Sequence, residues 1–184
     1  MNIFALSHCP VESAIWQHDK HVVKMLLETA QMLSANARLV PEWREKCVID
    51  NLSTPKQAHQ WLYSPAYVNH PCTIWARQTL GNFRWLCLHG VALWREFDYR
   101  FGGPHKSYDR IIKPLNHFAH NVFDYGDESM TPFAVAMPDE YKVPANAVES
   151  YRSYYVGEKI MANSKWTGRD RIADLPSWLS KHAL

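Results

Sequence analysis

The stretch HPCTIWARQTLGNFRWLCLHGVALWREFDYRFGG, residues 70–103, decides the fold. Pro71 suits the first position of a helix, because proline lacks the N–H that would stay unpaired there, and Gly102 is typical of a helix end. The sequence therefore predicts one helix over residues 71–101, about 45 Å long. Its large apolar side chains occupy nearly every side, as expected of a central helix: Ile74, Trp75, Phe83, Trp85, Leu86, Leu88, Val91, Leu93, Trp94 and Phe97.

Other segments carry helix signals as well. Residues 10–38 begin with Pro10 and contain no further Gly or Pro, which predicts a second long helix with one apolar face. Shorter helices are expected over residues 54–62, from Ser107 to about Lys113, and from Asn146 onward. No alternating pattern indicates paired strands. We expect an all-α chain, a compact single domain over residues 1–184 around the 71–101 helix, with an acidic, loop-rich excursion at about residues 114–145.

Composition limits the functional classes. The 184 residues include 20 basic and 18 acidic side chains, a net charge of +2, which argues against indiscriminate binding of polyanions. No apolar run approaches the roughly 18 residues that span a bilayer, and the first residues lack a basic segment, so we expect a cytoplasmic protein without a membrane partner. The four cysteines are scattered like reduced thiols. Without a P-loop, a dinucleotide glycine motif or H-E-x-x-H, we expect no cofactor and no metal.

Residues 17–28, QHDKHVVKMLLE, hold the densest group of reactive side chains. On a helix His21, Lys24 and Glu28 are neighbours, and Lys24 and Glu28 form an i,i+4 pair. A carboxylate beside an amine either holds it charged or, where both are dehydrated, tunes it towards a nucleophile that forms a Schiff base. The alternative interpretation is a solvated helix face with one weak ion pair. The candidate catalytic residues are Asp19, Lys20, His21, Lys24 and Glu28.

Three further groups fit contacts to a nucleic acid. Arg77 and the helix start at His70 and Trp75 offer an anion site. The second group lies at the far end of the predicted central helix and in the turn after it: Glu96, Tyr99, Arg100, His105 and Lys106. The third is the C-terminal run of aromatic and basic residues, with Tyr155 and Lys159. Capping, core packing and turn formation explain these residues about as well.

The segments HDKHVVKMLLETAQML (18–33), NHPCTIWAR (69–77), REFDYRFGGPHK (95–106) and YRSYY (151–155) resemble small phage-encoded helical proteins and, more distantly, the pyrimidine-dimer DNA glycosylase superfamily. The resemblance implies a helical domain that binds duplex DNA, exposes a damaged or modified pyrimidine and cleaves its glycosidic bond, with or without strand cleavage by β-elimination. By position, Asp19 matches the family's catalytic acidic residue, and a phage-encoded chain would act in the host cytoplasm.

The source of a nucleophilic amine stays open. The best-known family members use the amine exposed when the first Met is removed, but here Asn2 follows, a poor context for that removal. Lys20 or Lys24 is the alternative amine, and attack by water would give a glycosylase without lyase activity. Two other functions remain: a metal-dependent nucleotide or nucleic-acid phosphohydrolase, suggested by His8 and His18 beside Asp19, and a non-catalytic helical protein that binds a host factor.

Overall fold

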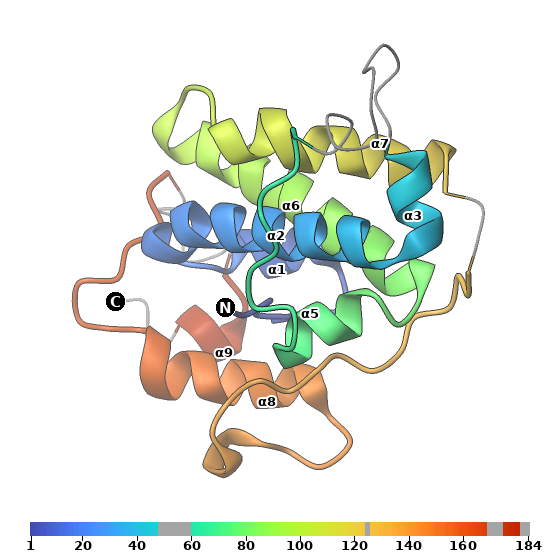
Figure 1. Ribbon diagram of the computed structural model, residues 1–184. Coiled ribbons are helices and arrows are strands. Elements are labelled where there is room, and N and C mark those ends of the chain that lie inside the picture. Colours follow the sequence, from blue (N-terminus) through green and yellow to red (C-terminus); the bar gives the residue numbers. More distant parts are fainter. Residues whose placement is uncertain (48–59, 124–125, 169–174, 181–184) are drawn as a thin grey trace.

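The computed structural model describes residues 1–47, 60–123, 126–168 and 175–180. These residues form helices joined by loops and contain no strand, so the all-α prediction is confirmed. Figure 1 shows α2 (Asp19–Leu39) and α6 (Leu80–Phe101) in the middle, with α7 (Lys113–Asn121) above them and α8 (Ala147–Tyr154) below. Among the described helices, none is long and apolar enough to cross a membrane.

Helix α6 is the central element. It packs against α2, α1 (Pro10–Ile15) and α7, and most of its residues are buried. Gly90 lets neighbouring side chains approach α6 closely, because a Cβ there would lie 2.9 Å from Cγ2 of Ile112 and 3.0 Å from Cγ2 of Thr29. The aromatic side chains that predicted a buried helix, Phe83 and Trp85 among them, are in the main hydrophobic core.

The prediction of one helix over residues 71–101 was wrong. The chain forms α5 (Pro71–Ala76) and then α6, separated by residues 77–79. The hydroxyl of Thr79 accepts the N–H of Asn82 at 3.0 Å, and the amide of Asn82 donates to the carbonyl of Trp75 at 2.8 Å. These bonds end one helix and begin the next without Gly or Pro in the break, so the apolar pattern did not reveal it.

The prediction of one helix over residues 10–38 was wrong for a tertiary reason. Helix α1 ends at Ile15 and α2 begins at Asp19. The guanidinium of Arg100, from α6, donates to the carbonyls of Ile15 at 2.9 Å and Gln17 at 2.8 Å. Two carbonyls that would serve a continuous helix are bound instead by a side chain 83 or more positions away.

The helix after Ser107 runs beyond its predicted end near Lys113. A π-helical turn, η1 (Tyr108–Ile112), leads directly into α7, which contains Pro114. A proline inside a regular α-helix clashes with the carbonyl four residues before it, and the wider π turn precedes Pro114 here. Residues 114–121 are therefore helical, and the loop of the acidic stretch begins after α7, interrupted by the 3-10 turn η2 (Asp139–Tyr141).

The remaining elements are short. Asn146 caps α8 as predicted, its side chain accepting the N–H of Glu149 at 3.0 Å, and the π turn η3 (Tyr155–Lys159) follows. Helices α3 (Pro41–Lys46) and α9 (Ser177–Ser180) complete the described set. The predicted helix over residues 54–62 lies mostly outside the described residues, and residues 60–62 form a turn.

Candidate functional site

The first residues of the chain are buried between α2 and α8. Ile3, Phe4, Ala5 and Leu6 are each 4% exposed or less. Asn2 fastens the segment, since its amide donates to the carbonyl of Ala136 at 3.0 Å and its Oδ1 accepts the N–H of Ile3 at 2.8 Å. A chain end is ordinarily loose unless something ties it down. Here the position of the Met1 amine is fixed by the packing behind it.

The Met1 amine lies beside the carboxylate of Glu28. Its Oε2 is 3.6 Å from the Met1 amine and accepts the backbone N–H of Asn2 at 3.0 Å. Its Oε1 lies 3.4 Å from Nζ of Lys24, one helical turn earlier on α2. The predicted pair of Lys24 and Glu28 therefore forms, and a second amine joins it.

A groove of about 430 Å³ opens beside this carboxylate. We call it the Glu28 groove. Its walls come from α2, from the N-terminal residue, from the loop before α5 and from the turn after α6: Met1, Val23, Lys24, Leu27, Glu28, Gln31, Tyr67, His105 and Ser107. The volume lies within the range of about 300–1,000 Å³ that is typical of small-ligand sites, and the walls combine apolar side chains with a few polar groups, as in such sites.

Two imidazoles border the same region. Burial lowers the pKa of His70, the Met1 amine lowers it further and Glu28 opposes the shift, so His70 is close to both groups. The Nδ1 of His70 also accepts the N–H of Cys72 at 3.2 Å, the capping role considered for it. Burial lowers the pKa of His105 as well, against the opposing charge of Asp109. Both side chains therefore favour the neutral form at pH 7.

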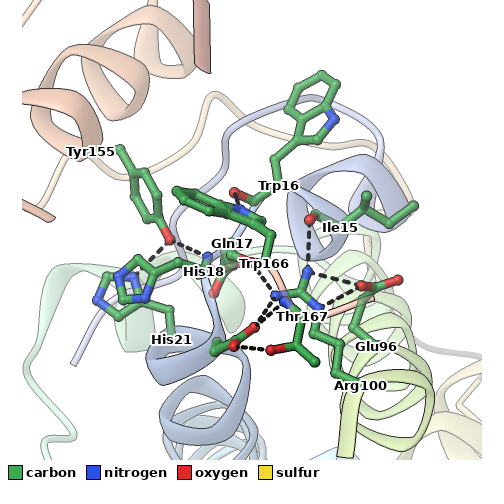
Figure 2. A network of polar contacts seen from close by, with 11 residues as sticks. Ile15, Trp16, Gln17, His18, His21, Glu96, Arg100, Tyr155, Trp166 and Thr167 are labelled. Carbon is green, nitrogen blue, oxygen red and sulfur yellow. Dashed lines mark hydrogen bonds and ion pairs between the residues drawn. The ribbon is translucent and has the colours of Figure 1, made fainter. Parts of the chain in front are cut away.

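Asp19 is placed differently from Glu28 and does not line the Glu28 groove. Its Oδ1 accepts from the guanidinium of Arg100 at 3.1 Å and from the backbone N–H of Thr167 at 3.0 Å, and its Oδ2 accepts from the hydroxyl of Thr167 at 2.7 Å. Arg100 also pairs with Glu96 at 2.9 Å (Figure 2). We call Arg100, Glu96, Asp19 and Thr167 the Arg100 network. It joins α6 to the break before α2 and to the C-terminal part of the chain.

His21 belongs to a stack of rings beside this network. Its ring stacks on Phe4 with centroids 4.6 Å apart. It also stacks on His18 at 4.2 Å, and its Nδ1 lies 3.1 Å from the hydroxyl of Tyr155 (Figure 2). Burial lowers the pKa of His21 to about 3, with His18, Lys24 and Lys159 adding to the shift. Burial likewise lowers the pKa of His18 to about 4, against the opposing charge of Asp19. Both imidazoles are therefore neutral at pH 7 and are packed among aromatic rings.

Several predicted DNA contacts lie inside the protein. Trp75, Glu96, Arg100 and Tyr155 are 6% exposed or less and pack or pair with protein groups. Arg77 is half-buried and donates to the carbonyl of Val68 at 2.7 Å. Tyr99 differs from these residues, since its side chain is 58% exposed and its hydroxyl donates to the carbonyl of Gly168 at 2.8 Å. The buried side chains have no surface to offer to DNA.

The predicted lysines are on the surface. Lys20, Lys24 and Lys106 are exposed, and Nζ of Lys159 lies 4.4 Å from the ring centre of Tyr154. The charges of Lys24 and Lys159 both lower the pKa of His21. Among the predicted site residues the structure thus brings together Lys24, Glu28 and His105 at the groove, with His70 near Glu28. Asp19, Glu96, Arg100 and Tyr155 come together away from the groove.

The candidate residues chosen from the sequence did not include Met1 or Tyr67, although the N-terminal amine was considered as a nucleophile. The run of apolar side chains at residues 3–6 was the available signal that this end of the chain is buried. Within the described ranges, no three side chains of the His, Cys, Asp and Glu types are grouped so as to hold a metal ion. No protein-family model matches the chain, and comparisons with curated proteins and with solved structures also found no match.

Proposed function

We propose that the protein is a DNA glycosylase that releases a damaged or modified pyrimidine and holds the sugar through a Schiff base. The observation that carries the proposal is the meeting of two amines, those of Met1 and Lys24, at the largely buried carboxylate of Glu28 beside a groove. An amine next to a carboxylate in a dehydrated site is the arrangement that covalent catalysis at a sugar carbon needs. The choice of a pyrimidine in DNA rests on the family resemblance.

The proposed reaction uses these groups. An unprotonated amine attacks C1′ of the nucleotide, and the glycosidic bond breaks with its electron pair leaving on the base, which takes up a proton. The sugar ring then opens as O4′ gains a proton, and the amine nitrogen forms a double bond to C1′. Loss of a proton from C2′ and departure of the 3′ phosphate would complete strand cleavage. Glu28 is placed to accept the proton of the amine and to stabilise positive charge at C1′.

The α-amine is the better candidate for the nucleophile. As a class, α-amines are weaker bases than the lysine amine, so a larger share is unprotonated at neutral pH. The Met1 amine is 3.6 Å from Glu28, and the backbone nitrogen of Asn2 is 3.0 Å from it. Removal of Met1 would therefore leave the α-amine of Asn2 at the same carboxylate, with a wider groove. Lys24, whose side chain is 66% exposed, is the alternative nucleophile.

The proposal assigns the carboxylate role to Glu28 and not to Asp19. The Asp19 carboxylate accepts hydrogen bonds from Arg100 and Thr167 of the protein itself. For DNA phosphates the proposal keeps the surface lysines Lys20, Lys24, Lys106 and Lys159. Arg77, Arg100, Trp75 and Tyr155 are left out because their side chains serve the fold.

Borohydride trapping tests this proposal. The full chain is incubated with a duplex that carries an abasic site and with duplexes that carry damaged pyrimidines, and sodium borohydride then reduces any Schiff base to a stable cross-link. Mass spectrometry of the cross-linked peptide identifies the amine. We expect the cross-link at the N-terminal α-amine, and a cross-link at Lys24 would move the nucleophile to that residue. The absence of any cross-link from the abasic duplex would overturn the proposal.

A matched pair of variants tests the carboxylate. Glu28→Gln keeps the size of the side chain but removes its charge, and we expect trapping to slow by roughly 100-fold, the scale of losing one preorganised electrostatic group. Glu45→Gln makes the same change at an exposed residue of α3 and should trap at the rate of the unmodified protein. Equal rates for the two variants would remove Glu28 from the chemistry.

A further inference from the structure

Among the residues that the structure describes, Tyr67 is the most exposed large apolar side chain, at 67%, and it lines the Glu28 groove. Its backbone is in the left-handed region, with φ of 51°. A bulky residue seldom adopts this conformation, because its side chain crowds the backbone. Neither its exposure nor its backbone angle is explained by packing, since an exposed ring in a strained turn contributes little to a core.

The loop around Tyr67 is fixed in this shape from both sides. The guanidinium of Arg38 donates to the carbonyls of Leu62 and Tyr63, each at 2.9 Å. Arg77 donates to the carbonyl of Val68 at 2.7 Å, and the carbonyl of Tyr67 itself accepts the N–H of His70 at 2.9 Å. The structure therefore holds a strained residue in place with charged donors, and the result is an aromatic ring at the groove.

Val23 and Leu27 line the same groove from α2 and are 43% and 45% exposed. They contribute methyl groups, Tyr67 contributes an aromatic face, and Gln31, His105 and Ser107 contribute groups that form hydrogen bonds. A planar ring with polar edges satisfies both kinds of wall. The amine of Lys24 adds positive charge, which suits a ligand that carries phosphate.

We propose that Tyr67 is a stacking platform for an unpaired nucleobase, and that it positions the strand whose sugar reaches Glu28. The inference rests on the proposed function for the identity of that strand, but the stacking itself requires only a nucleic acid. Aromatic side chains hold unpaired bases in this way, because every base offers a face to a ring. Tyr67 is a positioning residue here and takes no part in bond breaking.

The test uses an oligonucleotide that cannot react. A duplex carries a tetrahydrofuran abasic analogue, which forms no Schiff base, and 2-aminopurine beside it, whose fluorescence falls when the base stacks. We expect the full chain to bind this duplex and to quench the fluorescence. Tyr67→Phe keeps the ring and should behave in the same way. Tyr67→Asn tolerates the left-handed backbone but lacks the ring, and we expect about tenfold weaker binding without the quenching.

The controls separate stacking from folding and from charge. Phe101→Asn makes a similar change at an exposed ring of α6 and should bind like the unmodified protein. Tyr67→Gly relieves the left-handed strain, so its fold is secure, and it should match Tyr67→Asn. The salt dependence of binding should stay the same in every Tyr67 variant, because no phosphate contact is removed.

The outcomes distinguish this inference from the proposed function. If abasic DNA is trapped but Tyr67→Asn and Tyr67→Gly bind and quench like the unmodified protein, the stacking role alone is wrong. If Tyr67→Phe is as weak as Tyr67→Asn, the hydroxyl and not the ring is responsible, which also overturns it. If no cross-link forms but the ring-dependent quenching is seen, the glycosylase proposal fails and the stacking site remains. No binding of this duplex by the unmodified protein would overturn the stacking site.

Discussion

Asp19 and Glu28 are two carboxylates on one helix with opposite environments. Their side chains are almost equally exposed, at 18% and 13%, so burial does not separate them. Asp19 is bound by Arg100 and Thr167, which tie together distant parts of the chain. Glu28 is bound by groups at the edge of a groove. A carboxylate of a dense charged motif can reach a ligand only where its partners leave it beside an open groove, and this holds for Glu28 and not for Asp19.

Acid should affect the region of the Arg100 network most. The pKa of His18 and that of His89 are lowered to about 4 by burial, and the pKa of His21 to about 3. Because the unfolded chain takes up these protons near pH 6.5 and the folded chain does not, stability is lost as the pH falls from about 6.5 towards 4. We expect a loss of roughly 2 kcal/mol for each of the three by pH 5.

Urea unfolding at pH 7.5, 6 and 5 measures this loss. His89 gives the sharpest variant, since it is fully buried, with Nδ1 3.0 Å from the carbonyl of Pro10. His89→Gln should be less stable than the unmodified protein at pH 7.5 but should lose less stability on acidification. A free energy of unfolding that is constant or rises between pH 7.5 and 5 would contradict the assignment of neutral, buried histidines.

Arg100→Met should cause the next largest change. It removes four donated bonds and leaves the carboxylate of Glu96 buried without Arg100. Breaking a buried ion pair from one side costs about 3–5 kcal/mol. Lys24→Met breaks the exposed pair at the Glu28 groove instead, and we expect less than about 1 kcal/mol. Chemical denaturation of both variants checks the contrast, and equal losses would mean that the Arg100 network has no special structural role.

Asp19→Asn should lower stability without slowing trapping, and Glu28→Gln should slow trapping without lowering stability. The first weakens two bonds at Asp19, and we expect it to lower the free energy of unfolding by about 1–2 kcal/mol while borohydride trapping proceeds at the normal rate. The second should slow trapping and leave stability nearly unchanged. Melting temperatures and trapping rates of the two proteins decide this. Slow trapping by a well-folded Asp19→Asn protein would return the catalytic role to Asp19.

Local signals predicted the fold class and several element starts. Pro71 and Asn146 begin helices where their chemistry requires it, and Phe83 and Trp85 are buried as the apolar pattern indicated, whereas Tyr99 and Phe101 at the end of α6 are exposed. The interruptions at residues 16–18 and 77–79 were not predictable in this way. The first depends on Arg100, which is distant in the sequence, and the second on Asn82 and on contacts between Leu80 and the loop at Asp127.

The candidate site was predictable in part. The pair of Lys24 and Glu28 follows from helical spacing alone. The approach of Met1 does not, because it depends on the burial of residues 3–6 against other elements. The exposure of Arg77 and Arg100 was also misjudged from sequence, since an arginine is a phosphate ligand or a structural donor according to the carbonyls and carboxylates that surround it.

The smallest effect should be on the salt dependence of DNA binding. This measurement distinguishes surface lysines from structural arginines. Each phosphate contact releases about one counterion, so its loss lowers the slope of log K against log salt by about one unit. Lys106 is exposed in the turn beside the Glu28 groove, and Lys106→Gln should lower the slope by this amount with no change in melting temperature. Arg77 donates to the carbonyl of Val68, and Arg77→Gln should instead lower the melting temperature and leave the slope unchanged. Binding titrations from about 50 to 200 mM salt measure both slopes.

A reduced slope for Arg77→Gln together with an unchanged slope for Lys106→Gln would mean that DNA binds near Arg77 and not beside the Glu28 groove. The reacting nucleotide could then not lie in that groove.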